Sequence, residues 1–73
     1  MNYNKRIKDL REDHDLTQKQ VADILQTSQS YYAQYENGHR PITIERLIIL
    51  ADYYNVSMDY LTGRTNNPKN PNL

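Results

Sequence analysis

The sequence has no cysteine, only two glycines and three prolines, and no long run of apolar residues. The lack of cysteine excludes a disulfide framework and a thiolate metal site, and nothing points to an oxidising compartment. The longest apolar run, Leu47–Leu50, is far shorter than the ~20 residues that span a bilayer. The start of the chain, MNYNKRIKDL, is charged and has no apolar segment of the kind found in secretory signals. We therefore expect a soluble, cytoplasmic protein with no membrane segment.

The chain also lacks an excess of charge of either sign. Nine Lys and Arg residues balance nine Asp and Glu residues, so the formal net charge is zero. Because phosphate binding is driven by basic side chains that release counterions, this balance gives no support to a nucleic-acid partner. The basic residues are unevenly distributed, however, and the first segment contains Lys5, Arg6, Lys8 and Arg11. A neutral chain can still carry a basic face, so nucleic acid is not excluded.

A chain of 73 residues fits one small domain. Glycine and proline are sparse between residues 3 and 61, where apolar residues recur at helical spacing and do not alternate as in strands. The last stretch, RTNNPKNPNL, is polar and has no apolar period, which is typical of a disordered tail. We therefore predict an all-α domain over residues 1–63, followed by a disordered polar tail over residues 64–73.

Capping residues divide the domain into five short helices. The first is predicted over about residues 4–13. Thr17 and Gln20 have the spacing of a capping box, in which each side chain bonds to the other residue's backbone N–H, and they predict the start of the second helix. Ser28 is a good N-cap for the third helix, and Gly38 can end it in the left-handed conformation.

The fourth helix is predicted over about residues 43–54, with Asn55 ending it in the left-handed region. Ser57 then caps a short fifth helix that stops at Gly63. We expect one face of the fourth helix to turn inward, and this face carries Ile44, Leu47, Ile48, Ala51 and Tyr54.

On a helical wheel, the third helix divides into two faces of different chemistry. Tyr31, Tyr32 and Tyr35 share one side and are expected to pack inward. The opposite side is small or uncharged and carries Gln29, Ser30, Ala33, Gln34 and Asn37. The amide of glutamine matches the N7 acceptor and N6 donor of adenine in the major groove, and a small side chain can sit against a thymine methyl. The alternative is a solvated helix face that happens to carry glutamine.

A capped helix, a short turn and a second helix with an uncharged outer face are the plan of a helix-turn-helix motif. The stretch LTQKQVADILQTSQSYYAQYENGHRP, followed by LIILADYYNVSMDYL, resembles the phage-repressor (Cro/C1-type, XRE-like) helix-turn-helix family. The resemblance extends over about residues 7–61. It implies a compact five-helix, lambda-repressor-like domain whose third helix enters the major groove of double-stranded DNA.

The resemblance also implies roles for individual residues. Those expected to face base edges are Gln29, Ser30, Ala33 and Gln34. Those expected to touch the DNA backbone are Gln18, Asn37 and Arg40, and Lys19, placed just after the helix cap, is a further candidate. Arg11 and Glu36 match a pair that forms a salt bridge between the first and third helices. The alternatives remain that Gln18 is an ordinary first-turn residue and that Arg11 and Glu36 are separate surface charges.

The chain departs from the family pattern at Gln26, where glycine is common because the residue is left-handed. A residue other than glycine costs roughly 1 kcal/mol there. The third helix also carries neither Arg nor Lys, so it cannot itself supply arginine contacts to guanine. We therefore predict a preference for A·T pairs at the positions read by Gln29 and Gln34.

Catalysis has little support in the residues. The serines at positions 28, 30 and 57 lie at helix starts or on an outer face with no obvious histidine partner, and His14 and His39 fall in expected turns. The run from Asp13 to Asp15 lacks the spacing of a known metal motif. We expect no enzyme activity, no cofactor and no bound metal.

Two functions are therefore considered. The first is a sequence-specific DNA-binding transcriptional regulator, a repressor, that binds an inverted-repeat operator as a homodimer. Met58, Tyr60 and Leu61 are candidates for its dimer interface, although Leu61 is better explained by core packing. The alternative is a protein-interaction module of the same fold, antitoxin-like or polymerase-associated, that acts on a regulatory protein partner and has little specific DNA binding.

Overall fold

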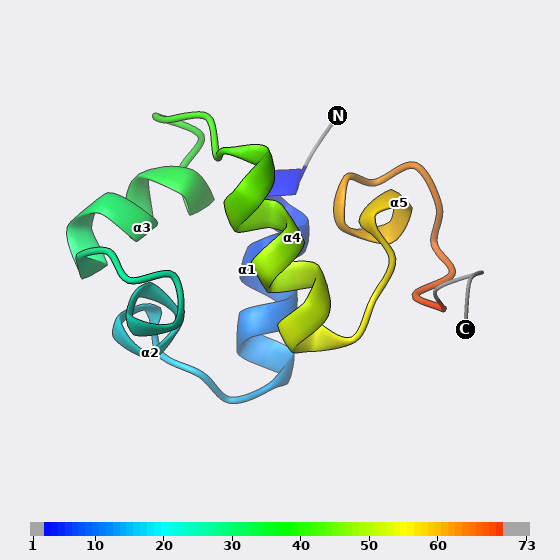
Figure 1. Cartoon of the computed structure of the whole chain (residues 1–73), viewed down its shortest axis with the longest axis horizontal. Coiled ribbons are helices and arrows are strands. Elements are labelled where there is room, and N and C mark those ends of the chain that lie inside the picture. Colours follow the sequence, from blue (N-terminus) through cyan, green and yellow to red (C-terminus); the bar gives the residue numbers. More distant parts are fainter. Residues whose placement is uncertain (1–2, 70–73) are drawn as a thin grey trace.

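The computed structural model describes residues 3–69 and contains five helices and no strand in that range, which confirms the all-α fold. The helices are α1 (Tyr3–Asp13), α2 (Gln18–Ile24), α3 (Gln29–Glu36), α4 (Ile44–Tyr54) and α5 (Met58–Leu61). Helix α4 crosses the front of the molecule with α1 behind it (Figure 1). Helices α2 and α3 lie on one side of this pair, and α5 lies on the other. Among the helices of residues 3–69, none has the length and apolarity needed to cross a bilayer.

Four of the helices begin at a hydroxyl side chain that accepts a hydrogen bond from a first-turn backbone N–H. The donor–acceptor distances are 3.1 Å for Thr17, 3.1 Å for Ser28, 3.3 Å for Thr43 and 3.0 Å for Ser57. The Gln20 side chain also accepts from the Thr17 backbone N–H at 2.8 Å, which confirms the capping box. These bonds satisfy N–H groups that have no partner within the helix, and so they set where each helix starts.

The core is a single cluster drawn from every helix, from the C-cap of α2 and from the segments that flank α4. Its buried members are Ile7, Leu10, Val21, Ala22, Leu25, Tyr32, Tyr35, Ile42, Leu47, Leu50, Ala51, Tyr54, Val56 and Leu61. Leu61 is fully buried, so it belongs to the core and is not available to a dimer interface. Met58 and Tyr60 are half-buried and pack against the same cluster.

The prediction for the inward face of α4 was wrong at two positions. Ile44 and Ile48 are 61% and 46% exposed, whereas Leu50, which was not assigned to that face, is fully buried. The reason is that α4 carries large apolar residues on more than one side, so spacing alone cannot select the buried stripe. The stripe that packs inward follows the i, i+3, i+4, i+7 pattern from Leu47 to Tyr54.

The predicted tail lies partly outside the described residues, which end at position 69. Residues 64–69 are irregular, with bends, and return toward the start of α5 and toward α1. The carbonyl of Pro68 accepts a hydrogen bond from the Ser57 backbone N–H at 3.1 Å, and Arg6 donates to the Asn66 side chain at 3.3 Å.

The turn between α2 and α3 contains Gln26 in the left-handed region, with φ of 58°. A left-handed conformation costs an ordinary L-residue roughly 1–2 kcal/mol, whereas glycine adopts it freely but loses more entropy on folding. Gln26→Gly should therefore stabilise the protein by about 0.5–1 kcal/mol, measured as a higher urea midpoint. Asn55→Gly, at φ of 56°, should gain less because asparagine tolerates this region. An equal gain at both positions would contradict this explanation.

Candidate nucleic-acid interface

Helix α3 carries the candidate base-reading residues on its outer side. Gln29 and Ser30 are exposed, while Ala33 and Gln34 are half-buried. The opposite side is anchored by Tyr32 and Tyr35, which are 0% and 1% exposed. The outer side therefore presents two amides, a hydroxyl and a methyl group on a helix whose other side is fixed in the core.

The third tyrosine of α3 differs from the other two. Tyr31 is half-buried, and its ring lies 5.6 Å from that of Tyr35 in an edge-on arrangement. The guanidinium carbons of Arg40 and Arg46 lie 4.5 Å and 5.5 Å from the centre of the Tyr31 ring. Arg46 also donates to the Tyr35 hydroxyl at 2.6 Å. Tyr31 therefore binds two cations at the flank of α3, in addition to packing against the core.

A buried carboxylate joins the helix-turn-helix to α1. Glu36, at the end of α3, is 8% exposed and accepts four hydrogen bonds. Arg11 donates through Nε at 2.7 Å and through Nη2 at 3.1 Å. The other two donors are the Tyr32 hydroxyl at 2.5 Å and the Gln18 amide nitrogen at 3.2 Å. One carboxylate therefore fixes α1, the start of α2 and the end of α3 relative to one another.

The electrostatics of this cluster favour its charged state. Burial alone would raise the pKa of Glu36, but the hydrogen bonds from Arg11, Tyr32 and Gln18 outweigh it, and the pKa lies below its ordinary value. The hydrogen bond to Glu36 in turn raises the pKa of the Arg11 guanidinium, which also donates to the Leu16 carbonyl at 2.9 Å. Both charged groups of the pair, the Arg11 guanidinium and the Glu36 carboxylate, thus have several hydrogen-bond partners.

Several of the residues predicted to contact the DNA backbone have partners within the protein. The amide nitrogen of Gln18 is engaged by Glu36, so in the free protein Gln18 holds α2 against α3. Lys19 is exposed, and its Nζ lies 3.5 Å from Oδ2 of Asp23, one turn along α2. Asn37 is the exposed C-cap of α3. Arg40 is exposed, but its Nε donates to the side chain of Gln34 at 3.2 Å.

Sequence reasoning missed Arg46 as a neighbour of the α3 surface. Its position in the first turn of α4 gives no local signal, because its contacts with Tyr31 and Tyr35 depend on how α4 packs against α3. The contacts of Arg40 with Tyr31 and Gln34 were not predicted either, and its role at the DNA backbone stays a prediction.

Residues 7–61 match the family model described as Helix-turn-helix. The chain belongs to the helix-turn-helix family. This confirms the resemblance to Cro/C1-type regulators. Over 66 residues, covering 90% of this chain, it is 38% identical to YobD of Bacillus subtilis, an uncharacterized HTH-type transcriptional regulator. Over its whole length it is 34% identical to RstR, a cryptic phage CTXphi transcriptional repressor of Vibrio cholerae.

The fold is also shared with a solved structure. A transcriptional regulator from Listeria innocua superposes with a TM-score of 0.82 at 31% identity, over 89% of this chain. This chain spans 59% of YobD, 65% of RstR and 61% of the Listeria protein. It thus corresponds to about three fifths of the length of these relatives.

Proposed function

We propose that this chain is a sequence-specific DNA-binding transcriptional regulator, a repressor, that acts in the cytoplasm, where its DNA target lies. The observation that carries the proposal is the outer side of α3. It is uncharged, small in its middle and rich in amide groups, and it is held rigidly by two buried tyrosines and the Glu36 cluster. The names of relatives support regulation, and RstR in particular is named a repressor.

The mechanism follows from the order of side chains along α3. Ser30 and Ala33 are small enough to let the helix approach the base edges in the major groove. Gln29, near the start of α3 and fully outward, can pair with adenine through both atoms of its amide. Lys19 and Asn37 lie near the two ends of the motif, where phosphates flank the groove, and contacts there would set the register of the helix on DNA. Occupation of the operator is then the regulatory event.

The experiment is selection of bound sequences from a randomised duplex pool at moderate salt, with wild type and Gln29→Ala side by side. We expect an enriched inverted repeat for wild type, with one base pair per half-site whose preference is lost in Gln29→Ala. Asn66→Ala, an amide removed on the opposite side of the molecule, is the matched control and should leave the selected sequence unchanged. Weak binding without enrichment would favour the alternative, a module that binds a protein partner.

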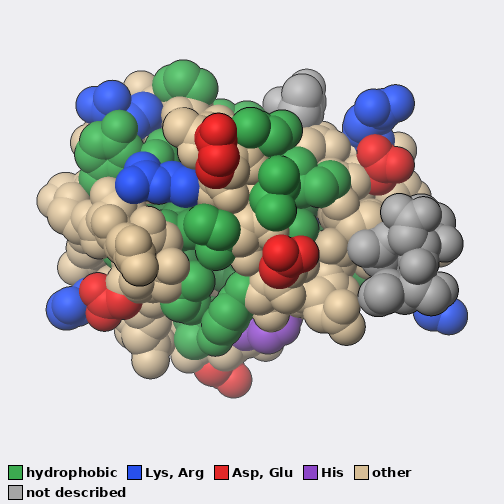
Figure 2. Space-filling model, viewed as in Figure 1, with side chains coloured by type: hydrophobic (Ala, Val, Ile, Leu, Met, Phe, Trp, Pro, Cys, Tyr) green, Lys and Arg blue, Asp and Glu red, His purple; other side chains and the backbone are tan. Residues whose placement is uncertain are grey.

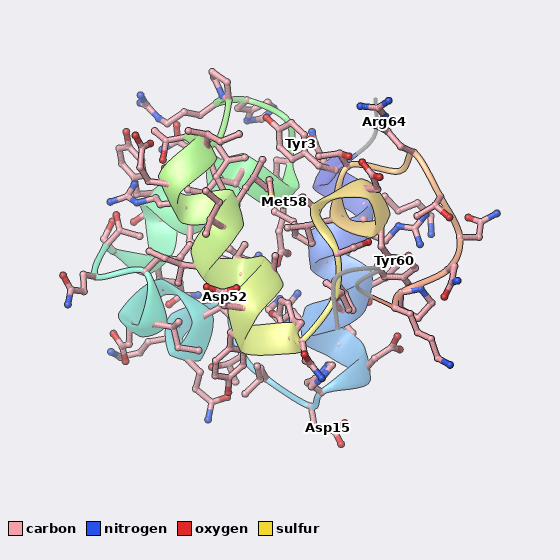
Figure 3. All side chains as sticks on the ribbon, turned by 45° about the vertical axis from the view of Figure 1, so that its right-hand side comes forward. Tyr3, Asp15, Asp52, Met58, Tyr60 and Arg64 are labelled. Carbon is pink, nitrogen blue, oxygen red and sulfur yellow. The ribbon has the colours of Figure 1, made fainter. Side chains whose placement is uncertain are left out.

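The proposal includes a dimer on DNA, and the exposed apolar surface is where we place its interface. All four exposed large hydrophobic side chains of the described residues lie on α4, namely Ile44, Ile48, Ile49 and Tyr53. Figure 2 shows apolar groups gathered over this helix, with acidic groups among them. Figure 3 places Asp52 on α4, and Met58 and Tyr60 on α5 beside it. Helix α3 lies at the side of the molecule, so a partner on α4 leaves it uncovered (Figure 1).

The occupant of the α4 face is a second copy of this chain. Two copies related by the two-fold axis of an inverted-repeat operator can pack the same patch of each copy against the other. The patch is on the order of a few hundred Å², below the ~800 Å² that each partner of a stable interface buries. In addition, Glu45 and Asp52 lie on this face, and neither side chain has an ion-pair partner among residues 3–69. Like charges brought together weaken the contact, so the dimer should form only where DNA holds two copies adjacent.

Ile48→Glu should therefore abolish paired binding. On a full inverted repeat, wild type should form a complex of two copies, measured by sedimentation, whereas Ile48→Glu should bind its half-sites independently with unchanged affinity for a single half-site. Lys8→Glu, at an exposed residue of α1, is the control, and Asp52→Asn should strengthen pairing by reducing repulsion. A weakened complex in Asp52→Asn, or unchanged pairing in Ile48→Glu, would contradict a second copy on α4.

A further inference from the structure

The loop after α3 folds back onto the helix that it leaves. The backbone N–H groups of His39 and Arg40 both donate to the carbonyl of Gln34, at 2.9 Å and 3.3 Å. This arrangement directs the Arg40 side chain back along α3 and not away from it. Its guanidinium lies over the Tyr31 ring at 4.5 Å, and its Nε donates to Oε1 of Gln34 at 3.2 Å. A cation is therefore held at the edge of the outer side of α3, although the helix itself carries no basic residue.

The contact with Arg40 fixes which way the Gln34 amide points. A guanidinium has only donors, so the amide oxygen must face Arg40 and the amide nitrogen must face away from it. The nitrogen lies 3.5 Å from the Ser30 carbonyl, at the limit of a hydrogen bond, so it remains able to donate elsewhere. Pairing with adenine needs the glutamine oxygen to accept from N6 while the nitrogen donates to N7. Arg40 takes one of the two lone pairs of the Gln34 oxygen and directs that oxygen toward the guanidinium, which disfavours this pairing with adenine.

We propose that Arg40 is a specificity-determining residue and that Gln34 and Arg40 together read guanine. Most of the groups that the pair leaves available are donors, namely the amide nitrogen of Gln34 and the Nη groups of Arg40, against one remaining lone pair on the Gln34 oxygen. The major-groove edge of guanine presents only acceptors, O6 and N7, whereas adenine presents one acceptor and one donor. The pair therefore fits guanine better than adenine, in contrast to the A·T preference expected from Gln34 alone. This inference rests on the proposed entry of α3 into the major groove.

The position of the guanidinium is prepared before DNA binds. Stacking on Tyr31 and the bond to Gln34 both restrict the Arg40 side chain, and the two backbone hydrogen bonds fix the loop that carries it. A side chain held in its bound position loses less entropy on binding. A contact to phosphate alone would not need this arrangement, because a flexible cationic side chain such as lysine can bind a phosphate as a point charge.

The test is bound-sequence selection with wild type, Gln34→Ala, Arg40→Ala and Lys19→Ala. The base pair that loses its preference in Gln34→Ala identifies the position, and wild type should prefer G·C there by roughly 5- to 100-fold. In Arg40→Ala the Gln34 amide is released, so the preference at that position should change from G·C to A·T. Lys19→Ala is the control for a backbone contact and should weaken all sequences equally.

The outcomes separate this inference from the proposed function. An enriched operator with A·T at the Gln34 position in wild type would overturn the inference and leave the proposed function standing. So would an Arg40→Ala variant that keeps the wild-type base preferences and weakens every sequence equally, because Arg40 would then contact phosphate alone. If wild type enriches no sequence, the proposed function fails, and the role of Arg40 fails with it.

Discussion

Glu36→Ala is expected to lower the free energy of unfolding by about 3–5 kcal/mol, because it leaves the Arg11 charge buried without its partner. The Arg11 side chain is only 12% exposed, and Gln18 and Tyr32 lose an acceptor at the same time. For a domain of this size the loss corresponds to a melting temperature lower by roughly 15–30 °C. Since small domains have only about 5–15 kcal/mol in total, much of the variant should be unfolded at 37 °C.

The matched control is Glu45→Ala, which removes an exposed carboxylate with no ion-pair partner among residues 3–69. It should change the melting temperature of the free protein by no more than a few degrees. Circular dichroism during heating measures both variants. Equal melting temperatures for Glu36→Ala and wild type would show that the cluster around Glu36 does not stabilise the fold.

The same cluster gives a pH dependence of known sign. The pKa of Glu36 is lower in the folded protein than its ordinary value, which is about 4.3 in an unfolded chain. Its contribution to stability is therefore complete above the unfolded value and is lost as the pH falls through the folded value. The difference in free energy of unfolding between wild type and Glu36→Gln should thus shrink as the pH is lowered below about 4. A stability difference that stays constant from pH 7 to pH 2 would contradict this.

Ala33→Glu is expected to reduce affinity for the selected operator by at least roughly 100-fold while the protein remains folded. Ala33 lies in the middle of the outer side of α3, between the amides of Gln29 and Gln34. A longer, negatively charged side chain there would hold the helix away from the bases and repel the phosphates. Losing two base contacts of about 1–3 kcal/mol each already accounts for the expected change.

Asn66→Glu is the control, since it adds the same charge in the segment after α5, which lies on the side of the molecule opposite α3 (Figure 1). In that segment Arg6 donates to the Asn66 side chain. Its affinity should stay within a few-fold of wild type, and both variants should melt within a few degrees of wild type. If Ala33→Glu binds the operator as tightly as wild type, the outer side of α3 does not face DNA.

The parts of this molecule that follow local rules were predictable from sequence. Thr17, Ser28 and Ser57 each cap a helix as expected, because a cap depends on residues only three positions apart. The left-handed Gln26 was anticipated as well, but only through resemblance to the family.

The errors and omissions arise where distant segments decide the outcome. Ile48 was assigned inward because α4 is apolar on several sides, and only packing against the rest of the core distinguishes them. The bond from Gln18 to Glu36 and the contacts of Arg46 with α3 join residues far apart in sequence. Arg40 could not be placed on α3 because the loop path depends on backbone bonds to Gln34 that no residue pattern specifies.

Sequence-specific DNA binding is tested most directly by the affinity of the wild-type chain for the selected duplex and for a scrambled duplex, measured by fluorescence anisotropy over a range of salt concentrations. We expect the selected duplex to bind at least about 10³-fold more tightly than the scrambled one. We also expect log affinity for both duplexes to fall linearly with log salt, with a slope of about −0.9 for each phosphate contact. Equal affinities for the two duplexes, or affinities that do not change with salt, would contradict sequence-specific DNA binding and favour a protein-binding module.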